Sequence, residues 1–279
     1  MRANSFFCPH LFCKKMLLAI DIGNSNIKFA TFAGEKLISK FAIPTDRNQT
    51  SEDIYSIIKS HLSSRISAVI ISTVVTQLEF PFRSLFEEFF KISPVFVDNT
   101  FDFGFSINYF PPESLGSDRL LNAFAAVNKY GKPCIICSFG TATTIDVISS
   151  KNEFLGGIIA PGMKTLADSL FEKTSKLPKV EIVKPESVIG NSTVKSIQSG
   201  IFFGYIGLVD GIINKMFAEL KEKPQIIATG GYSGLISENS EFIEILDENL
   251  LLEGLRMIYE RNVPPAYRRL SGERLARRT

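Results

Sequence analysis

The feature that most constrains the fold is a glycine turn that occurs twice in the chain. The first copy is residues 21–25 (Asp-Ile-Gly-Asn-Ser) and the second is residues 138–142 (Ser-Phe-Gly-Thr-Ala). Each copy follows a short apolar run and precedes two further strand-like runs. The copies lie 138 − 21 = 117 residues apart, which is the size of a domain rather than of a short structural repeat. The sequence therefore predicts a duplicated domain.

The pattern around the turns alternates strands with helices. Alternation and β-branched runs predict strands at residues 17–22, 27–32, 37–43, 67–75, 94–97, 133–137, 143–149, 153–160 and 225–228. Helical spacing of apolar residues predicts helices at residues 52–62, 78–91, 115–130, 162–173, 192–220 and 250–260. Such alternation is typical of an α/β fold with helices packed on sheets.

Charge is concentrated at the two ends of the chain. The net charge of +2 is the sum of +3 in residues 1–15, +4 in residues 262–279 and therefore −5 between them. A mildly acidic body argues against nucleic-acid binding. With 45% apolar and 22% charged residues, the composition is that of a globular protein. We therefore predict domains at residues 16–131 and 132–261, with a disordered N-terminal extension, 1–15, and a disordered basic tail, 262–279.

The cysteine and hydropathy patterns indicate the cellular compartment of the protein. Cys134 and Cys137 lie three residues apart in a predicted strand, so their side chains point to opposite faces and cannot easily pair. Cys8, His10 and Cys13 lack a second ligand pair of matching spacing, which argues against a metal site. No apolar run reaches the roughly 18–20 residues that cross a bilayer. We therefore predict a cytoplasmic protein without a membrane span.

The glycine turns suit phosphate binding. A glycine between strands lets backbone N–H groups approach a ligand, and neighbouring small polar side chains add donors. One turn alone is usually only a hairpin, but two turns can hold a polyphosphate from both sides. Asp21 adds a carboxylate that suits a hydrated magnesium ion. The residues that carry this interpretation are Asn24, Ser25, Thr141, Thr143, Thr144 and the late Thr229-Gly230-Gly231 run.

A second constellation, Gly116-Ser117-Asp118-Arg119, opens the helix predicted after the Pro111-Pro112 pair. One interpretation is an N-cap, with Ser114, Ser117 or Asp118 satisfying free backbone N–H groups. The other is catalytic: Asp118 would accept a proton from a substrate hydroxyl as it attacks the γ-phosphate. Arg119 would then bind a substrate carboxylate or the transferring phosphoryl group. The sequence leaves both open.

At this point the motifs resemble a known family, the type III pantothenate kinases, from Met16 to about Arg261. This family belongs to the superfold shared by acetate kinase, sugar kinases and actin. The matching segments, in order, are residues 21–25, 116–119, 139–146, 156–162, 190–193 leading into Ser199-Gly200, and 229–231. The resemblance implies two duplicated actin/ribonuclease-H-like domains, each a mixed sheet flanked by helices, with the active site in the cleft between them.

The resemblance also implies an activity, ATP-dependent phosphorylation of the 4′-hydroxyl of pantothenate, the first step of coenzyme A synthesis. Asp118 looks like the general base, and Asp21 would manage magnesium and phosphates. The implied nucleotide-binding residues are Asp21, Gly23, Asn24, Ser25, Lys28, Gly140, Thr141, Ala142, Thr143, Gly230 and Gly231. The implied pantothenate contacts are Tyr109, Gly116, Ser117, Arg119 and Thr193, the last from the neighbouring subunit of a homodimer.

One departure from the family pattern concerns Ser138. The family usually has an aspartate here, which resembles a ligand for an activating monovalent cation, potassium or ammonium. A neutral serine hydroxyl is a weaker partner for a cation. The sequence therefore predicts that turnover depends less on potassium, unless backbone carbonyls hold the ion.

Two rival functions and one ambiguous segment stay open. The first rival is another small-molecule kinase of the same superfold, against which the Gly-x-Asp-Arg element argues. The second is a regulatory or binding protein that kept the fold, for which the loss of an acid at Ser138 is the one hint. The apolar segment 194–217 is interpreted as a core helix between the domains, as a homodimer interface, or as both.

Overall fold

The computed structural model describes residues 16–62 and 66–263. The chain divides after Phe96 into two compact units, and the second runs from Val97 to Asn262. The predicted extension 1–15, including Cys8, His10 and Cys13, and the tail beyond Val263 lie outside the described residues. The domain boundary at 131/132 and the cleft between domains stay predictions.

The first unit is built on a five-stranded mixed sheet in the order β3-β2-β1-β4-β5. Strands β1, β2 and β3 run antiparallel to one another, while β4 and β5 add in parallel beyond β1. The strands are β1 (Met16–Ile22), β2 (Asn26–Ala33), β3 (Lys36–Pro44), β4 (Ile66–Thr73) and β5 (Val95–Phe96). Each lies where the residue pattern predicted a strand, to within a few residues.

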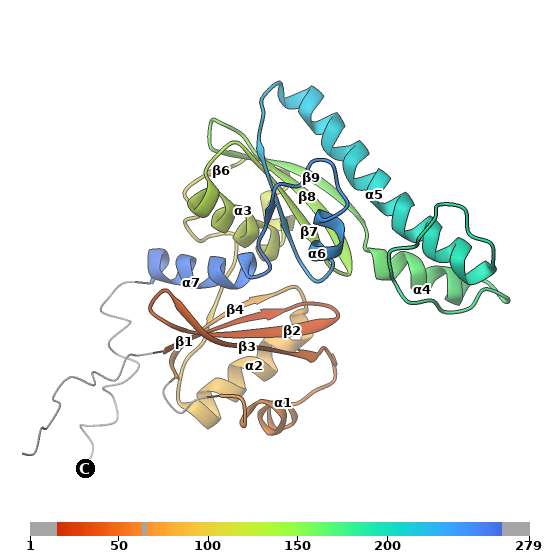
Figure 1. The fold of residues 1–279 in the computed structure, drawn as a ribbon. Coiled ribbons are helices and arrows are strands. Elements are labelled where there is room, and N and C mark those ends of the chain that lie inside the picture. Colours follow the sequence, from red (N-terminus) through yellow and green to blue (C-terminus); the bar gives the residue numbers. More distant parts are fainter. Residues whose placement is uncertain (1–15, 63–65, 264–279) are drawn as a thin grey trace, which may run out of the picture. The chain divides into compact units, whose positions relative to one another are not determined.

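The helices of this unit pack on the core side of the sheet (Figure 1). α1 (Ser51–Ile58) begins at a capping box in which Thr50 and Asp53 satisfy each other's backbone N–H groups. The helix predicted at residues 78–91 is not continuous: a 3₁₀ turn (Thr76–Leu78) leads into α2 (Glu79–Leu85), and a π-helical turn (Phe86–Phe90) follows. Phe82 and Phe86 are both fully buried in the core of this unit.

The second unit repeats the sheet of the first. Its order is β11-β10-β7-β8-β9-β6, and β7, β8 and β9 run antiparallel while β10 and β11 add in parallel. The strands are β6 (Ser106–Ile107), β7 (Cys134–Phe139), β8 (Ala142–Ile148), β9 (Glu153–Pro161), β10 (Gln225–Thr229) and β11 (Ile245–Leu246). With β6 set aside, the two orders are the same. The predicted duplication and the two-sheet α/β fold class are confirmed.

Helices cover both faces of the second sheet (Figure 1). α5 (Thr193–Leu220) and α4 (Met163–Lys173) pack on one face, and α3 (Ser117–Tyr130) packs on the other. α7 (Leu250–Asn262) lies against α3, where Gly254 approaches the backbone of Leu121 so closely that an added Cβ would be 2.7 Å from its carbonyl oxygen. The short β6, β11 and α6 (Ser233–Ser237) escaped the sequence patterns because elements this short carry little periodicity.

Among the described residues, α5 is the one helix long and apolar enough to span a membrane by length and composition. The sequence pattern predicted no such segment. Ile201, Tyr205, Val209 and Ile213 from this helix are buried in the second core, which is typical of a core helix that passes the same test. The segment is therefore a core helix of the second unit, and its predicted place between the domains stays a prediction. Cys134 and Cys137 are buried and free, as their spacing predicted.

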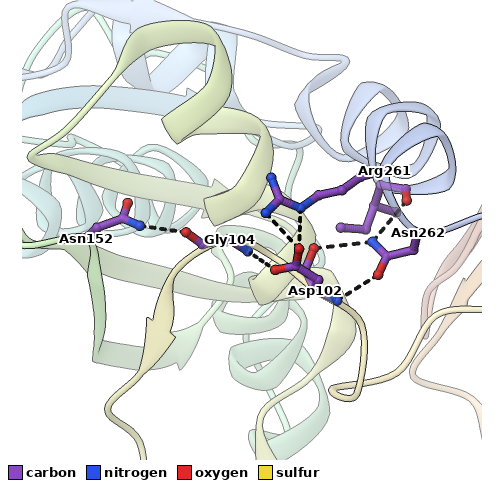
Figure 2. Close-up of polar contacts among 6 residues, drawn as sticks. Asp102, Gly104, Asn152, Arg261 and Asn262 are labelled. Atoms are coloured by element: carbon purple, nitrogen blue, oxygen red, sulfur yellow. Dashed lines mark hydrogen bonds and ion pairs between the residues drawn. The ribbon is translucent and has the colours of Figure 1, made fainter.

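A polar cluster ties the start of the second unit to its last helix (Figure 2). Arg261 Nε donates to Asp102 Oδ2 at 2.9 Å, and Asn262 Oδ1 accepts from the Asp102 backbone N–H at 2.7 Å. Gly104 donates its N–H to Asp102, and its carbonyl accepts from Asn152. The cluster holds the segment that leads through β6 to Tyr109.

Candidate active site

The first glycine turn joins β1 to β2. The Gly23 N–H donates to the Asn26 carbonyl at 3.1 Å, and an added Cβ on Gly23 would lie 3.1 Å from the same oxygen. The segment after β3 closes over the turn: Thr45 donates its N–H to the Ser25 carbonyl at 3.1 Å and its hydroxyl to the Gly23 carbonyl at 2.7 Å. These bonds hold the turn in one shape, with Asn24 and Ser25 exposed.

Asp21 lies at the end of β1, beside this turn. Asp21 is only 7% exposed, and one of its carboxylate oxygens lies 3.8 Å from Lys28 Nζ on the neighbouring strand. Register explains the contact, because Asp21 and Lys28 are directly paired across β1 and β2. The structure therefore groups five predicted nucleotide residues at one end of the first sheet: Asp21, Gly23, Asn24, Ser25 and Lys28.

The second glycine turn joins β7 to β8 and is shaped by backbone packing. The Gly140 N–H donates to the Ala142 carbonyl at 3.1 Å. Gly162, the N-cap of α4, donates its N–H to the Thr141 carbonyl at 2.9 Å, and an added Cβ on Gly162 would lie 2.1 Å from the Gly140 carbonyl oxygen. No side chain larger than hydrogen fits there without moving the turn.

Gly230 approaches the same turn from β10. Its φ is +98°, and an added Cβ would lie 2.5 Å from the carbonyl oxygen of Phe139. The structure thus brings Gly140, Thr141, Ala142 and Gly230 together. It adds Gly162, which belongs to a matching motif but had no predicted role.

Thr143 is placed differently from the other residues of this turn. It is fully buried, and its hydroxyl is hydrogen-bonded to the hydroxyl of Tyr205 on α5. Alternation along β8 explains this, since Thr143, Ile145 and Val147 share the face that α5 covers. Any phosphate contact made by Thr143 would therefore come from its backbone.

Ser138 holds the place in the second sheet that Asp21 holds in the first. Each is the last-but-one paired residue of its central strand, opposite Thr144 and Lys28 respectively. Each also pairs with a hydroxyl residue on the parallel neighbour, Ser138 with Thr229 and Asp21 with Ser72. The two sheets are therefore equivalent at this point, and only one of them carries an acid.

The Gly116–Arg119 element forms the start of α3. Gly116 is the N-cap and contributes no side-chain hydrogen bond. The Asp118 carboxylate instead folds back: its Oδ1 accepts from the Arg119 N–H at 2.8 Å, and an added Cβ on Gly116 would lie 2.5 Å from Oδ1. Glycine at 116 therefore makes room for the Asp118 carboxylate, which lies half-buried in the first turn of the helix.

Arg119 is buried and holds three segments together. Its Nε donates to both carboxylate oxygens of Asp146 on β8 at 3.1 Å, and its Nη2 donates to Oδ1 as well. The guanidinium carbon lies 5.3 Å from the centre of the Tyr109 ring and 5.7 Å from that of Phe154. The structure thus brings Tyr109, Asp118 and Arg119 to one place.

Asp146 is the site residue that sequence reasoning missed. It lies in a matching motif but received no role. The signal was available, because a charged residue at an inward position of a buried strand needs a partner. What sequence could not supply was the identity of that partner, which lies 27 residues away on α3.

Electrostatics couple these groups. Burial lowers the pKa of the Arg119 guanidinium, but hydrogen bonds and the charge of Asp146 outweigh it and raise that pKa. Burial raises the pKa of the Asp146 carboxyl, Arg119 acts against it, and the negative charge of Asp118 adds to the rise. Arg119 therefore stays charged, between two acids that repel each other.

Thr193 lies apart from this group. It is exposed, begins α5, and lines a cavity of about 950 Å³ with Gly190, Asn191 and Ser192. Within the described part of the chain it makes no hydrogen bond with Tyr109, Asp118 or Arg119. Its predicted role requires a second subunit.

The described residues offer no cluster of side chains that would by itself hold a metal ion. Residues 16–62 and 66–263 contain no group of three or more His, Cys, Asp or Glu side chains that could hold a metal ion. Asp21 fits a different arrangement, in which Mg²⁺ keeps its waters and is held by one carboxylate and the substrate phosphates. Ser138 contributes only a hydroxyl and a carbonyl oxygen toward a monovalent cation.

Two mixed sheets of one strand order, each with a glycine turn after its central strand, form a duplicated, actin-like α/β fold. A solved structure of a putative N-acetylmannosamine kinase from Listeria monocytogenes shares the fold, with a TM-score of 0.51 at 12% identity, covering 88% of this chain and 99% of that one. Another, of a putative Baf family transcriptional activator from Campylobacter jejuni, reaches 0.57 at 20% identity, covering 88% and 98%.

The sequence relatives are more specific. The family model for type III pantothenate kinase matches residues 17–215. A type III pantothenate kinase from Geotalea daltonii is 44% identical over 254 residues, covering 88% of this chain and 99% of that protein. One from Koribacter versatilis is 40% identical over 275 residues, covering 92% and 100%. The chain belongs to the type III pantothenate kinase family, which confirms the resemblance found in its motifs.

Proposed function

We propose that this protein uses ATP to phosphorylate the 4′-hydroxyl of pantothenate, the first step of coenzyme A synthesis. The observation that carries the proposal is the start of α3, where Gly116 makes room for the Asp118 carboxylate beside a buried, charged Arg119. Pantothenate offers the matching chemistry: an alcohol that needs a base and a carboxylate that suits a guanidinium.

In the reaction, Asp118 accepts the proton of the 4′-hydroxyl as its oxygen bonds to the γ-phosphorus. The bond from the γ-phosphorus to the β–γ bridging oxygen breaks, and ADP leaves with the electron pair. Arg119 is held by Asp146, so its charge is fixed in place rather than mobile. Arg119 uses Nε and Nη2 in its bonds to Asp146. Its third guanidinium nitrogen, Nη1, would donate to the substrate carboxylate or to the phosphoryl group.

The nucleotide phosphates bind at the two glycine turns. At the first, Gly23, Asn24, Ser25 and Lys28 would contact them, and Asp21 would hold a hydrated Mg²⁺. A bound Mg²⁺ neutralises charge on the phosphates. At the second, backbone groups of Gly140, Thr141, Ala142 and Thr143 take part, together with Gly230 and Gly231. Support comes from the close backbone packing at Gly162 and Gly230, which fixes the shape of this turn.

The monovalent-cation site is weakened in this protein. Ser138 holds the place equivalent to Asp21 and brings no negative charge. A neutral hydroxyl attracts potassium or ammonium less than a carboxylate does. Turnover therefore depends less on potassium than in family members with an aspartate there.

The enzyme acts as a homodimer whose substrate sites lie at the subunit interface. Thr193 of each subunit completes the pantothenate site of the other, alongside Tyr109, Gly116 and Ser117. Support comes from the exposure of Thr193 and of neighbouring apolar side chains, with Ile189 87% exposed. The remaining proposals are a cytoplasmic location, domains at 16–131 and 132–261 with a cleft between them, and no nucleic-acid or membrane partner.

Two alternatives are separated by one assay. The first is a kinase for another small molecule, the kind of protein that the Listeria structure is named as. The second is a regulatory protein, the kind that the Campylobacter structure is named as; both structures share only the fold with this chain. Release of ADP is measured with pantothenate and with a panel of sugars and short acids, in potassium and in sodium. Turnover with pantothenate alone supports the proposal; turnover only with another acceptor, or none, contradicts it.

A further inference from the structure

The segment after β3 carries a cation onto the first glycine turn. Thr45 fixes this segment through its two bonds to the carbonyls of Gly23 and Ser25. Two residues further on, the Arg47 guanidinium reaches Asn24, where Nη2 donates to Oδ1 at 2.9 Å. A side chain 23 positions away in sequence is thus bonded to the turn itself.

Among the residues that the structure describes, Arg47 has no acidic partner. No carboxylate of the described residues forms an ion pair with it, and the adjacent Asp46 instead accepts from the Asn48 N–H at 2.9 Å. Lys28, the other cation at this turn, lies 3.8 Å from Asp21. Arg47 therefore supplies an uncompensated positive charge at this place.

The bond to Asn24 also orients that side chain. With Oδ1 accepting from Arg47, the Asn24 amide nitrogen points the other way and presents two N–H donors. The guanidinium uses one of its five N–H groups in this bond. Both side chains are thus arranged as donors at a turn whose backbone already suits an anion, and a guanidinium matches phosphate oxygens in pairs.

We propose that Arg47 binds the triphosphate of the nucleotide together with the first glycine turn and positions Asn24 to do the same. The inference rests on the proposed nucleotide role of this turn. Removing a cation that forms a charge-assisted hydrogen bond to phosphate is expected to raise the KM for ATP by about 10- to 100-fold. The KM for pantothenate does not change.

Arg47→Gln tests this, with Lys36→Gln as the matched control. Lys36 is exposed, begins β3 at the opposite end from Pro44, and its substitution removes the same charge. KM values for ATP and pantothenate are measured at low and high salt, with melting temperatures to verify folding. The expected result is a rise in the KM for ATP in Arg47→Gln only, persisting at high salt. Arg47→Lys keeps the charge but loses the paired N–H donors of the guanidinium. Its KM for ATP is expected to lie between those of the wild type and Arg47→Gln.

The coupling to Asn24 is tested by a double-mutant cycle. If Arg47 acts partly by orienting Asn24, the effects of Arg47→Gln and Asn24→Ala on the KM for ATP are less than additive. A KM for ATP within twofold of wild type in Arg47→Gln, or equal changes in Arg47→Gln and Lys36→Gln, overturns the inference. Asp21→Ser separates this from failure of the proposed site: if it too leaves ATP kinetics unchanged, the turn does not bind nucleotide.

Discussion

Asp21 and Ser138 occupy equivalent positions in two sheets of the same strand order, yet the packing around the turns beside them differs. In each turn a threonine hydroxyl donates to a carbonyl, Thr45 to Gly23 at the first and Thr165 to Thr141 at the second. The first turn also receives the Arg47 guanidinium at Asn24. The second is instead met by Gly162 and Gly230, where an added Cβ would collide with its backbone. A charged side chain thus lies at the first turn, and close backbone packing surrounds the second.

This difference predicts whether a substitution at each turn changes ligand binding or stability. Polar side chains at the first turn can be exchanged with small effects on packing, so substitutions there are expected to alter ligand binding. Gly162 and Gly230, which pack against the second turn, leave no room for a side chain, so substitutions there are expected to alter stability first.

Asp118→Asn separates proton transfer from phosphate binding at the turns. The amide cannot accept the proton, so kcat is expected to fall by about 10²- to 10⁴-fold while the KM for ATP changes little. Steady-state kinetics with pantothenate and ATP measure this. An unchanged kcat contradicts the role of Asp118 and favours its alternative role at the start of the helix.

Asp21→Ser gives the first turn the residue that the second turn carries. Loss of the carboxylate removes a fixed charge from the magnesium and phosphate site, so kcat/KM for ATP is expected to fall by about 10²- to 10³-fold. Magnesium titrations measure whether the metal requirement weakens. If activity stays within a few-fold of wild type, the two turns do not differ in the way that their charges suggest.

Gly230→Ala tests the packing of the second turn. A Cβ at φ +98°, 2.5 Å from a carbonyl oxygen, is expected to lower the free energy of unfolding by more than about 1 kcal/mol. For a unit of this size that corresponds to at least about 2–4 °C in the melting temperature. Gly231→Ala is the matched control, because an added Cβ there meets nothing within 4 Å. Equal melting temperatures for both variants contradict the packing argument.

Ser138→Asp restores symmetry between the turns and has the smallest expected effect. The new carboxylate would strengthen a monovalent-cation site, so the ratio of turnover in potassium to turnover in sodium is expected to rise by a few-fold, about the size of a partly solvated charge interaction. A wild-type protein that already shows strong potassium activation contradicts the premise, because the cation would then be held without an acid.

Much of the fold was predictable from the residue pattern. Alternation and tight turns predicted the three antiparallel strands of each half, and duplication of the glycine turn predicted duplication of the sheet. The two-residue strands β6 and β11 were not predicted, because they form only where a neighbouring strand pairs with them, whereas β5, equally short, was. The helix predicted at residues 78–91 is divided into 3₁₀, α and π turns, which the apolar spacing did not reveal because all three have similar periods.

The candidate site divides along the same line. The sequence by itself determined the repeated turns, the Gly-x-Asp-Arg element and the missing acid at Ser138, because these are local patterns of residue type. Only the tertiary structure decided that Arg119 pairs with Asp146, that Arg47 bonds Asn24 and that the Thr143 hydroxyl is turned onto Tyr205. Such contacts join residues 23 to 62 positions apart, and strand register and helix packing, which depend on the whole core, determine them.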